Sequence, residues 1–447
     1  MERTYLIRTF GCQMNEHDSE RIGGLLAADG MTPTDDMSAA RVVVFNTCAI
    51  RENADNRLYG NLGHLKPLKD DDPSLRIVVA GCLAQKDRGE IQRRAPWVDV
   101  VVGTHALPHL LELLRASEDD GPQMDVREYT EVFPSALPAA RHDDFRAWVS
   151  IAPGCDNACT FCIVPLVRGP QRSRSIGDIL AEVQGLAQRG VVEVTLLGQN
   201  VNTFGRDVTV PGSANRPLFG ELLRQVGRVD GIRRVRFTSP HPHDFTPDVI
   251  DAMAETPAVC EHIHFPLQSG SDRVLKAMRR SYRRDRYLGW LDAIRASIPD
   301  IAVSTDVIVG FPGETEDDFA QTLDVVGRAR FDSAYTFQYS PRPGTQAATY
   351  DDQIPKEVVQ ERFDRLVELQ QRISLERSLA HVGATFEVLV EGAGKRGPST
   401  QARTRTNRIV HIPDALEPGS FAHARIVAAS AHHLTGALVP SPEAVAV

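Results

Sequence analysis

Three cysteines stand within eight positions in the segment APGCDNACTFCIV, residues 152–164. Cys155, Cys159 and Cys162 follow the spacing C-x3-C-x2-C. Thiolates bind zinc and iron, but a structural zinc ion takes four protein ligands, usually from paired knuckles. No partner pair follows, and His142 is the nearest side chain that could act as a fourth ligand. An iron–sulfur cluster fits better, because one cysteine per iron on a short loop suits a four-iron cluster.

Cys260 is the one cysteine that follows this motif, in the segment TPAVCEHIH. A cluster with four cysteine ligands would need it. We interpret it instead as a core thiol, because it enters an expected strand and free cysteines are among the most buried residues.

A second trio of cysteines is spread through the first hundred residues. Cys12, Cys48 and Cys82 each follow an apolar run, in the sequences FGC, NTC and AGC. The runs alternate with helical segments, a pattern typical of a parallel α/β sheet. Function lies at the carboxyl ends of such strands. We therefore expect these three thiols to converge at one sheet edge as a second site with one open position. The other interpretation is three isolated buried thiols.

Composition limits the class of protein. The chain has 447 residues, 42% hydrophobic residues, seven cysteines and a formal net charge of −9. This length corresponds to roughly three domains. The cysteines are too sparse for a disulfide framework, and the N-terminal segment lacks an apolar signal core, so we expect a cytoplasmic protein. Since the chain is acidic, a nucleic-acid partner would need local basic patches.

The element pattern predicts an α/β chain with three parts. Residues 1–116 read as the parallel α/β domain, and residues 117–144 as an acidic, Pro-rich linker. Residues 145–377 contain six β/α units, which predicts an open relative of the eight-fold barrel with its site at the strand C-termini. Residues 378–443 are rich in short strands and predict a small closed β-barrel.

The barrel motif, with Phe161 before its last cysteine, resembles the signature of the radical S-adenosylmethionine (SAM) superfamily. That resemblance implies a 4Fe-4S cluster on Cys155, Cys159 and Cys162 whose fourth iron is chelated by the methionine moiety of SAM. It also suggests SAM contacts at the ends of later strands. Turn glycines and helix caps are an equally good interpretation of these positions. They are Gly198, Gln199, Asn200, Gln268, Ser304 and Asp306.

Longer segments resemble the methylthiotransferase family, and within it the branch that acts on tRNA. They are TFGCQMNEHDSE, FNTCAIRENADNRLYGNLG, AGCLAQ, LLGQNVNTFG and DVIVGFPGETEDDF. The resemblance covers nearly the whole chain and implies a second 4Fe-4S cluster on Cys12, Cys48 and Cys82. One departure is Pro240 in FTSPHPHDF, where the family has serine before His-Pro.

The resemblance implies a reaction that uses SAM twice. One SAM methylates sulfur on the N-terminal cluster, and a second is cleaved to a radical that abstracts hydrogen from carbon 2 of adenine. The implied substrate is N6-isopentenyladenosine next to the anticodon, at position 37 of tRNA. No catalytic residues beyond the cluster ligands are implied, and both triads are expected to face one pocket.

Alternative functions remain open at this point. A methylthiotransferase can act on threonylcarbamoyladenosine in tRNA or on a ribosomal protein. A more remote alternative is a non-catalytic RNA-binding protein with structural zinc. We expect electron-donor and sulfur-donor proteins as further partners, a monomeric chain and no membrane partner.

RNA contacts are expected in two basic segments. GKRGPSTQARTRTNRIVHI, residues 394–412, contains no acidic residue and resembles the TRAM module, a small RNA-binding barrel. On an alternating strand, Arg403 and Arg405 would share a face, although charged barrel edges are also common without RNA. RGPQRSRS, residues 168–175, is the second segment. The predicted RNA-binding residues are Arg168, Lys395, Arg396, Arg403, Arg405 and Arg408.

Three aromatic residues alternate on the sixth barrel strand. Tyr335, Phe337 and Tyr339 could stack on the target base, but core packing is the favoured interpretation of such a stripe.

Overall fold

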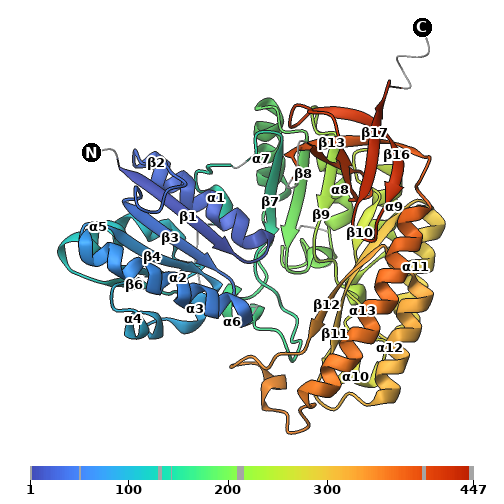
Figure 1. Cartoon of the computed structure of the whole chain (residues 1–447), viewed down its shortest axis with the longest axis horizontal. Helices are drawn as coiled ribbons and strands as arrows, with labels where there is room; N and C mark the ends of the chain where they lie inside the picture. Colours follow the sequence, from blue (N-terminus) through green and yellow to red (C-terminus); the bar gives the residue numbers. More distant parts are fainter. Residues whose placement is uncertain are drawn as a thin grey trace.

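The structure is a computed structural model that describes residues 3–49, 52–128, 133–141, 143–208, 216–394 and 399–441, without the side chains of 52–56 and 134. An N-terminal α/β part lies beside a central open barrel, and a small β-barrel packs on the central part (Figure 1). Within the described residues, no helix combines the length and apolarity that crossing a lipid bilayer requires.

The N-terminal part is built on a six-stranded parallel sheet of order β2-β1-β3-β4-β5-β6. Its central strand β3 is buried along its whole length. Alternate side chains of β3 enter separate hydrophobic clusters, Val43 and Phe45 on one face and Val42 and Val44 on the other. The strands are β1 (Thr4–Phe10), β2 (Thr32–Pro33), β3 (Val42–Thr47), β4 (Arg76–Gly81), β5 (Val100–Val102) and β6 (Gln123–Asp125).

Helices cover both faces of this sheet, as the sequence predicts for parallel strands buried on both sides. Leu26 of α1 and Leu110 of α5 pack with Val44, whereas Leu58 of α2 packs with Phe45. The helices are α1 (Gln13–Ala28), α2 (Glu52–Asp71), α3 (Cys82–Asp87), α4 (Glu90–Arg94), η1 (Leu107–His109) and α5 (Leu110–Asp119).

The predicted linker, residues 117–144, differs from the structure at its start. Helix α5 continues to Asp119, and β6 pairs in parallel with β5, with Val100 opposite Gln123 and Val102 opposite Asp125. The linker prediction was wrong for these residues. A three-residue edge strand requires only backbone hydrogen bonds, so its polar sequence has no apolar period to reveal it. The rest of the segment contains a short 3-10 helix, η2 (Pro134–Ala136).

The central part confirms the prediction of six parallel strands in an open barrel. They form two sheets, β7-β8-β9 and β10-β11-β12, joined by a bridge between Val235 and Val259. One hydrophobic cluster runs between both sheets and their helices. The strands are β7 (Arg146–Ala152), β8 (Glu193–Gly198), β9 (Arg234–Phe237), β10 (His262–His264), β11 (Ala302–Val309) and β12 (Ser333–Gln338).

The crossover helices lie outside these strands (Figure 1). Three of them have side-chain N-caps: Ser175, Ser271 and Thr315 each accept a hydrogen bond from a backbone amide of the first turn that follows. The helices are α6 (Val164–Arg168), α7 (Ile176–Gln188), η3 (Val201–Thr203), α8 (Phe219–Val226), η4 (Pro242–Asp244), α9 (Pro247–Glu255), α10 (Asp272–Ala277), α11 (Arg284–Ser297), α12 (Glu316–Ala329), η5 (Gln346–Thr349) and α13 (Lys356–Leu379).

The C-terminal part is the predicted closed barrel, with strand order β13-β14-β15-β17-β16. Closure pairs every strand on both sides, so no long edge is left open. The strands are β13 (Thr385–Ala393), β14 (Thr400–Thr404), β15 (Ile409–Ile412), β16 (Phe421–Ala429) and β17 (Leu434–Val439).

Two arginines of β9 join this small barrel to the central part. Arg234, fully buried, donates to the carbonyl of Arg403 at 2.8 Å, and Arg236 donates to the carbonyls of Thr404 and Arg405 at 2.9 Å each. Because these bonds reach the turn after β14, the small barrel is held against the starts of the central strands.

Candidate functional site

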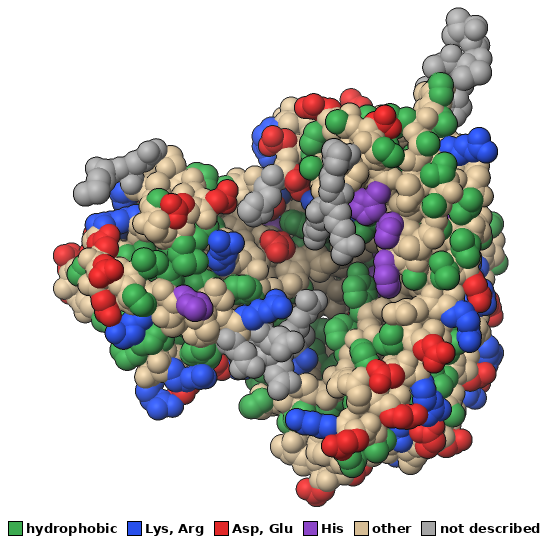
Figure 2. Space-filling view, viewed as in Figure 1, with side chains coloured by type: hydrophobic (Ala, Val, Ile, Leu, Met, Phe, Trp, Pro, Cys, Tyr) green, Lys and Arg blue, Asp and Glu red, His purple; other side chains and the backbone are tan. Residues whose placement is uncertain are grey.

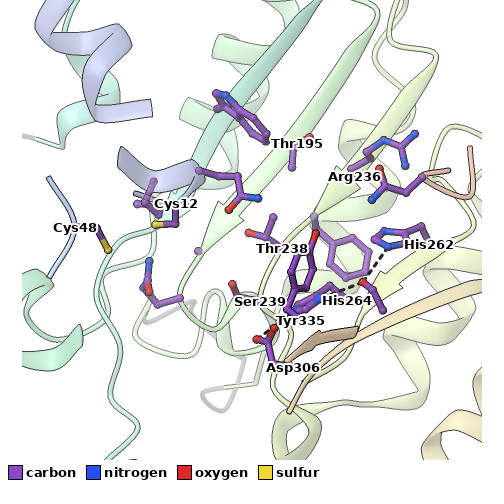
Figure 3. A pocket seen from close by; sticks show the side chains of 18 of the residues that line it. Cys12, Cys48, Thr195, Arg236, Thr238, Ser239, His262, His264, Asp306 and Tyr335 are labelled. Carbon is purple, nitrogen blue, oxygen red and sulfur yellow. Dashed lines mark hydrogen bonds and ion pairs between the residues drawn. The ribbon is translucent and has the colours of Figure 1, made fainter. Parts of the chain in front are cut away.

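The N-terminal thiols lie at the carboxyl ends of three neighbouring strands. Cys12 follows β1 and is the N-cap of α1, Cys48 follows β3, and Cys82 follows β4 as the first residue of α3. Figure 3 shows Cys12 and Cys48 at one side of the pocket described below. The topology therefore brings together three residues that are about 35 positions apart along the chain.

Asparagine side chains hold the cysteine turns in register. The amide nitrogen of Asn46 donates to the backbone oxygen of Asn15 at 2.8 Å, and that of Asn15 donates to the carbonyl of Thr47 at 3.3 Å. Gly81, beside Cys82, has φ +89°, and a Cβ there would lie 2.2 Å from Oδ1 of Asn46. A side chain at position 81 is therefore excluded by the same asparagine that orients the first two turns.

The electrostatic surroundings of these thiols favour a thiolate at Cys12. A hydrogen bond from the Cys48 thiol and the charge of Arg168 outweigh burial and lower the pKa of Cys12 to about 5. Burial raises the pKa of Cys82, and the nearby Arg168 guanidinium opposes that shift. Thiolates are the metal-binding form of cysteine. The positive charge of Arg168 therefore favours the metal-binding form of both Cys12 and Cys82.

The barrel thiols lie on the loop between β7 and α6. The Cys155 amide donates to the carbonyl of Gly169, and the Thr160 amide and hydroxyl donate to the carbonyls of Met278 and Ala277 at the C-terminal end of α10. Gly154 has φ +78°, and a Cβ there would lie 2.0 Å from the carbonyl oxygen of Pro170. The loop is thus tied at its start to the segment after α6 and in its middle to the end of α10.

A second arginine lies beside the barrel thiols. Nη1 of Arg280 is 3.5 Å from Sγ of Cys159, and its Nε donates to the Tyr282 hydroxyl at 3.3 Å. Burial raises the pKa of the Cys162 thiol to about 12. A free thiolate is therefore disfavoured at Cys162 unless a metal or a cation stabilises it.

Helix α6 links the two cysteine trios. It begins two residues after Cys162, and Ile163 and Val167 pack in one buried cluster with Ala49 and Cys82. Nothing in the sequence indicates that residues just after the barrel cysteines pack against a cysteine of the N-terminal trio.

A pocket of about 730 Å³ lies between the three parts of the chain. Figure 2 shows a hollow between the N-terminal part and the rest of the molecule. Cys12 and Cys48 line one side, and Phe161, next to Cys162, lines the pocket near the other trio. The Sγ atoms of the barrel trio and of Cys82 lie outside the lining. The pocket is therefore lined directly by two thiols of the N-terminal trio. Near the barrel trio it is lined by Phe161, the residue before Cys162.

Five of the six residues predicted to contact SAM line this pocket. They are Gly198, Gln199, Gln268, Ser304 and Asp306. Gln268 has φ +66° and a buried Oε1 that has no hydrogen-bond partner among the described residues. Asn200 lies outside the lining, and its side-chain amide donates to Asp244 at 2.8 Å.

The two predicted residues of β11, Ser304 and Asp306, belong to a polar cluster whose histidines on β10 were missed at the sequence level. Ser304 Oγ lies 3.2 Å from Nε2 of His262 and 3.0 Å from Nδ1 of His264, and Nε2 of His264 lies 3.2 Å from Asp306. The ring of Tyr335 meets His264 edge to face at 5.8 Å (Figure 3). The alternation in EHIHF is the signal that could have placed both histidines on one face.

Of the three aromatic residues in and just after β12, two are not in the core, contrary to the favoured interpretation. The side chain of Tyr335 is 59% exposed and that of Phe337 39% exposed, and both line the pocket. Tyr339 also lines it but packs edge to face on Phe311. The first two therefore offer open ring faces to a ligand.

The predicted RNA-binding arginines of the small barrel are held by ion pairs. Arg403 pairs with Glu391 at 2.6 Å, Arg405 with Glu261 at 2.8 Å, and Arg408 with Asp332. Their charges are compensated, and the last two pairs cross to the central part of the chain. Lys395 and Arg396 lie outside the described residues.

The predicted role of Arg168 does not fit its position. It is 6% exposed and pairs with Asp18 of α1 at 2.7 Å. A guanidinium buried between two parts of the chain has no surface to offer a phosphate, so the loop position alone misled the prediction.

The donor sets fit iron–sulfur clusters better than single zinc ions. Within the described ranges, no three His, Cys, Asp or Glu side chains are placed to hold one metal ion. Cys260 is buried beside Arg236 and Glu193, consistent with a core thiol, whereas His142 falls outside the described residues. Three cysteine thiols match a cluster that takes one thiolate per iron, and the unpartnered Oε1 of Gln268 leaves a polar position for SAM.

Comparisons with known proteins match three segments of the chain. The Radical SAM superfamily profile matches residues 149–326, the Uncharacterized protein family UPF0004 profile residues 4–103, and the TRAM domain profile residues 380–439. The radical SAM methyltransferase TsrM from Kitasatospora setae, in a structure with cobalamin and a [4Fe-4S] cluster bound, has a TM-score of 0.56 at 15% identity, covering 78% of this chain and 77% of its own. That likeness concerns the fold.

The chain is therefore a radical SAM enzyme, a class that uses a [4Fe-4S] cluster and SAM. The tRNA-2-methylthio-N(6)-dimethylallyladenosine synthase 1 of Mycobacterium marinum is 58% identical over 452 residues, 97% of this chain and 85% of the relative. The synthase of Kineococcus radiotolerans is 56% identical over 453 residues, with 97% and 88% covered. This chain belongs to the family of tRNA-2-methylthio-N(6)-dimethylallyladenosine synthases and is a transferase.

Proposed function

We propose that this protein inserts a methylthio group at carbon 2 of N6-isopentenyladenosine next to the anticodon of tRNA, using two 4Fe-4S clusters. The observation that carries the proposal is the pocket that opens on Cys12 and Cys48 at one side and on the predicted SAM contacts at the other. A radical made at one trio must meet its substrate beside the sulfur source, because it reacts before it can diffuse.

Each trio of thiols has a chemical role in this proposal. A cluster on Cys155, Cys159 and Cys162 would supply the electron that cleaves SAM, and a cluster on the N-terminal trio would hold the sulfur that is transferred. Phe161, Gly198 and Gln268 would hold SAM between them, because all three line the pocket.

The wall opposite Cys12 suits an adenine. Tyr335 and Phe337 present exposed rings on which a base can stack, and His264, fixed by Ser304 and Asp306, packs edge to face with Tyr335. An anticodon-loop base is already unpaired, so presenting it to this wall costs less than extruding it from a duplex. Since its substrate is tRNA, we place the protein in the cytoplasm.

Nucleoside mass spectrometry tests the proposal. Transfer RNA from cells that lack this protein should lose the methylthio group and retain N6-isopentenyladenosine, and the purified enzyme should restore it on isopentenylated tRNA only. Loss of a methylthio group from threonylcarbamoyladenosine, or from a ribosomal protein, would assign the chain to the other substrate instead. About eight irons per chain after anaerobic purification is expected for two four-iron clusters; stoichiometric zinc in a colourless sample would contradict both.

A further inference from the structure

Arg168 is a buried cation at the boundary between the N-terminal and central parts. It is the last residue of α6, the helix that follows the barrel cysteines, yet its Nη2 donates to Asp18 of α1 at 2.7 Å. The carbonyl of Val167 accepts from the Thr104 hydroxyl at 2.6 Å, which ties the same helix end to the N-terminal sheet. A helix of the central part therefore places this guanidinium beside the N-terminal trio.

Its charge acts on two thiols of that trio. Val167, the preceding residue of α6, packs in one buried cluster with Cys82, and the charge of the Arg168 guanidinium favours the thiolate forms of Cys12 and Cys82. Cys48 and Cys82 are almost completely buried. Charges in such surroundings interact strongly, because little water screens them, and an anionic centre there needs a compensating charge.

We propose that Arg168 supplies the positive charge that stabilises the anionic N-terminal cysteine centre and raises its reduction potential, and that Asp18 moderates this effect. The inference rests on the proposed function in requiring a cluster on Cys12, Cys48 and Cys82. Reduction adds one negative charge to such a centre, and a nearby cation stabilises the more negative state. Net charge and hydrogen bonds to sulfur are established determinants of cluster potentials.

The barrel trio offers a matched comparison. Arg280 lies 3.5 Å from Cys159, with the neutral hydroxyl of Tyr282 as its other neighbour. Across the described ranges, no carboxylate lies within 4.0 Å of its guanidinium. The two centres therefore differ in that the cation of the N-terminal one is partly neutralised by Asp18.

Redox titration of the full-length chain tests the inference. Replacing Cys155, Cys159 and Cys162 together by Ala leaves only the N-terminal trio to hold a cluster, whose iron content and potential are then measured anaerobically. In that background Arg168→Gln should shift the potential downward, and Asp18→Asn should shift it upward. Arg168→Lys should return most of the shift, because it retains the charge.

The opposite signs separate an electrostatic role from a structural one. Both substitutions break the same ion pair, so a purely structural role would lower thermal stability alike and leave the potential unchanged or moved in one direction. Either result overturns the inference. If Arg168→Gln retains no iron, Asp18→Asn and Arg168→Lys still decide it. Arg280→Gln, in the same background, should leave this potential unchanged, since it neighbours the other trio.

The outcome is independent of the substrate. Shifts of the expected signs in a protein that does not methylthiolate tRNA would sustain the inference and refute the proposed function. If the enzyme methylthiolates tRNA but the substitutions leave the reduction potential unchanged, the inference about Arg168 is refuted and the proposed function is sustained.

Discussion

Replacing Tyr335 by Ala removes the most exposed aromatic ring of the pocket. The ring is 59% exposed in the free protein, so its removal leaves no cavity in the core. Among the described residues, its ring packs edge to face with that of His264, which keeps its contacts with Ser304 and Asp306. The change should therefore act on the ligand and leave protein stability nearly unaltered.

The magnitude follows from the stacking of one base on one ring. Stacking contributes about 1–3 kcal/mol per base, which corresponds to a roughly 5- to 150-fold weaker binding. The loss should appear in the dissociation constant of an anticodon stem-loop that carries N6-isopentenyladenosine, measured by fluorescence anisotropy at one salt concentration because such binding is salt-dependent. Single-turnover modification at saturating RNA should fall less than kcat/KM.

Two controls accompany this measurement. Tyr335→Phe keeps the ring and should bind within twofold of the unaltered protein. Val427→Ala changes a comparably exposed apolar residue, 54% exposed, on the small barrel outside the pocket lining and should have no effect. Unchanged binding and kcat/KM for Tyr335→Ala would refute the assignment of this wall to the base, since an open ring in the site would then contact nothing.

Further substitutions test the other parts of the molecule. Cys159→Ala should abolish formation of 5′-deoxyadenosine, whereas Cys48→Ala should keep it detectable and stop sulfur insertion; a normal yield of methylthiolated tRNA from Cys48→Ala would remove that trio from the reaction. Arg405→Ala should weaken tRNA binding and reduce its salt slope by about one if the residue contacts a phosphate. An unchanged slope with a lower thermal midpoint would assign it to the ion pair with Glu261. Arg234→Met removes the hydrogen bonds to the carbonyls of Arg403 and Glu387 and should cost about 1–3 kcal/mol for each buried acceptor left unpaired; unaltered thermal unfolding would contradict that interface.

The sequence alone determined the two cysteine trios and the parts of the chain that carry them. Cys12, Cys48 and Cys82 each follow a segment that reads as a strand, and the periodicity of strands and helices is a local property that neighbouring residues reveal. The spacing of Cys155, Cys159 and Cys162 is local in the same way. The fold class and the closed C-terminal barrel were predictable for this reason.

Only the tertiary structure decided which charges are free and which surfaces face the pocket. Arg168, Arg405 and Arg408 look alike in a basic segment, but their partners Asp18, Glu261 and Asp332 lie about 75 to 150 positions away. A guanidinium that pairs with a carboxylate far away along the chain becomes part of an interface between elements. The sequence around the arginine cannot predict such a pair. The same holds for Tyr335 and Phe337: alternation places them on one face, but whether that face is packed or open depends on where the other strands and the small barrel end.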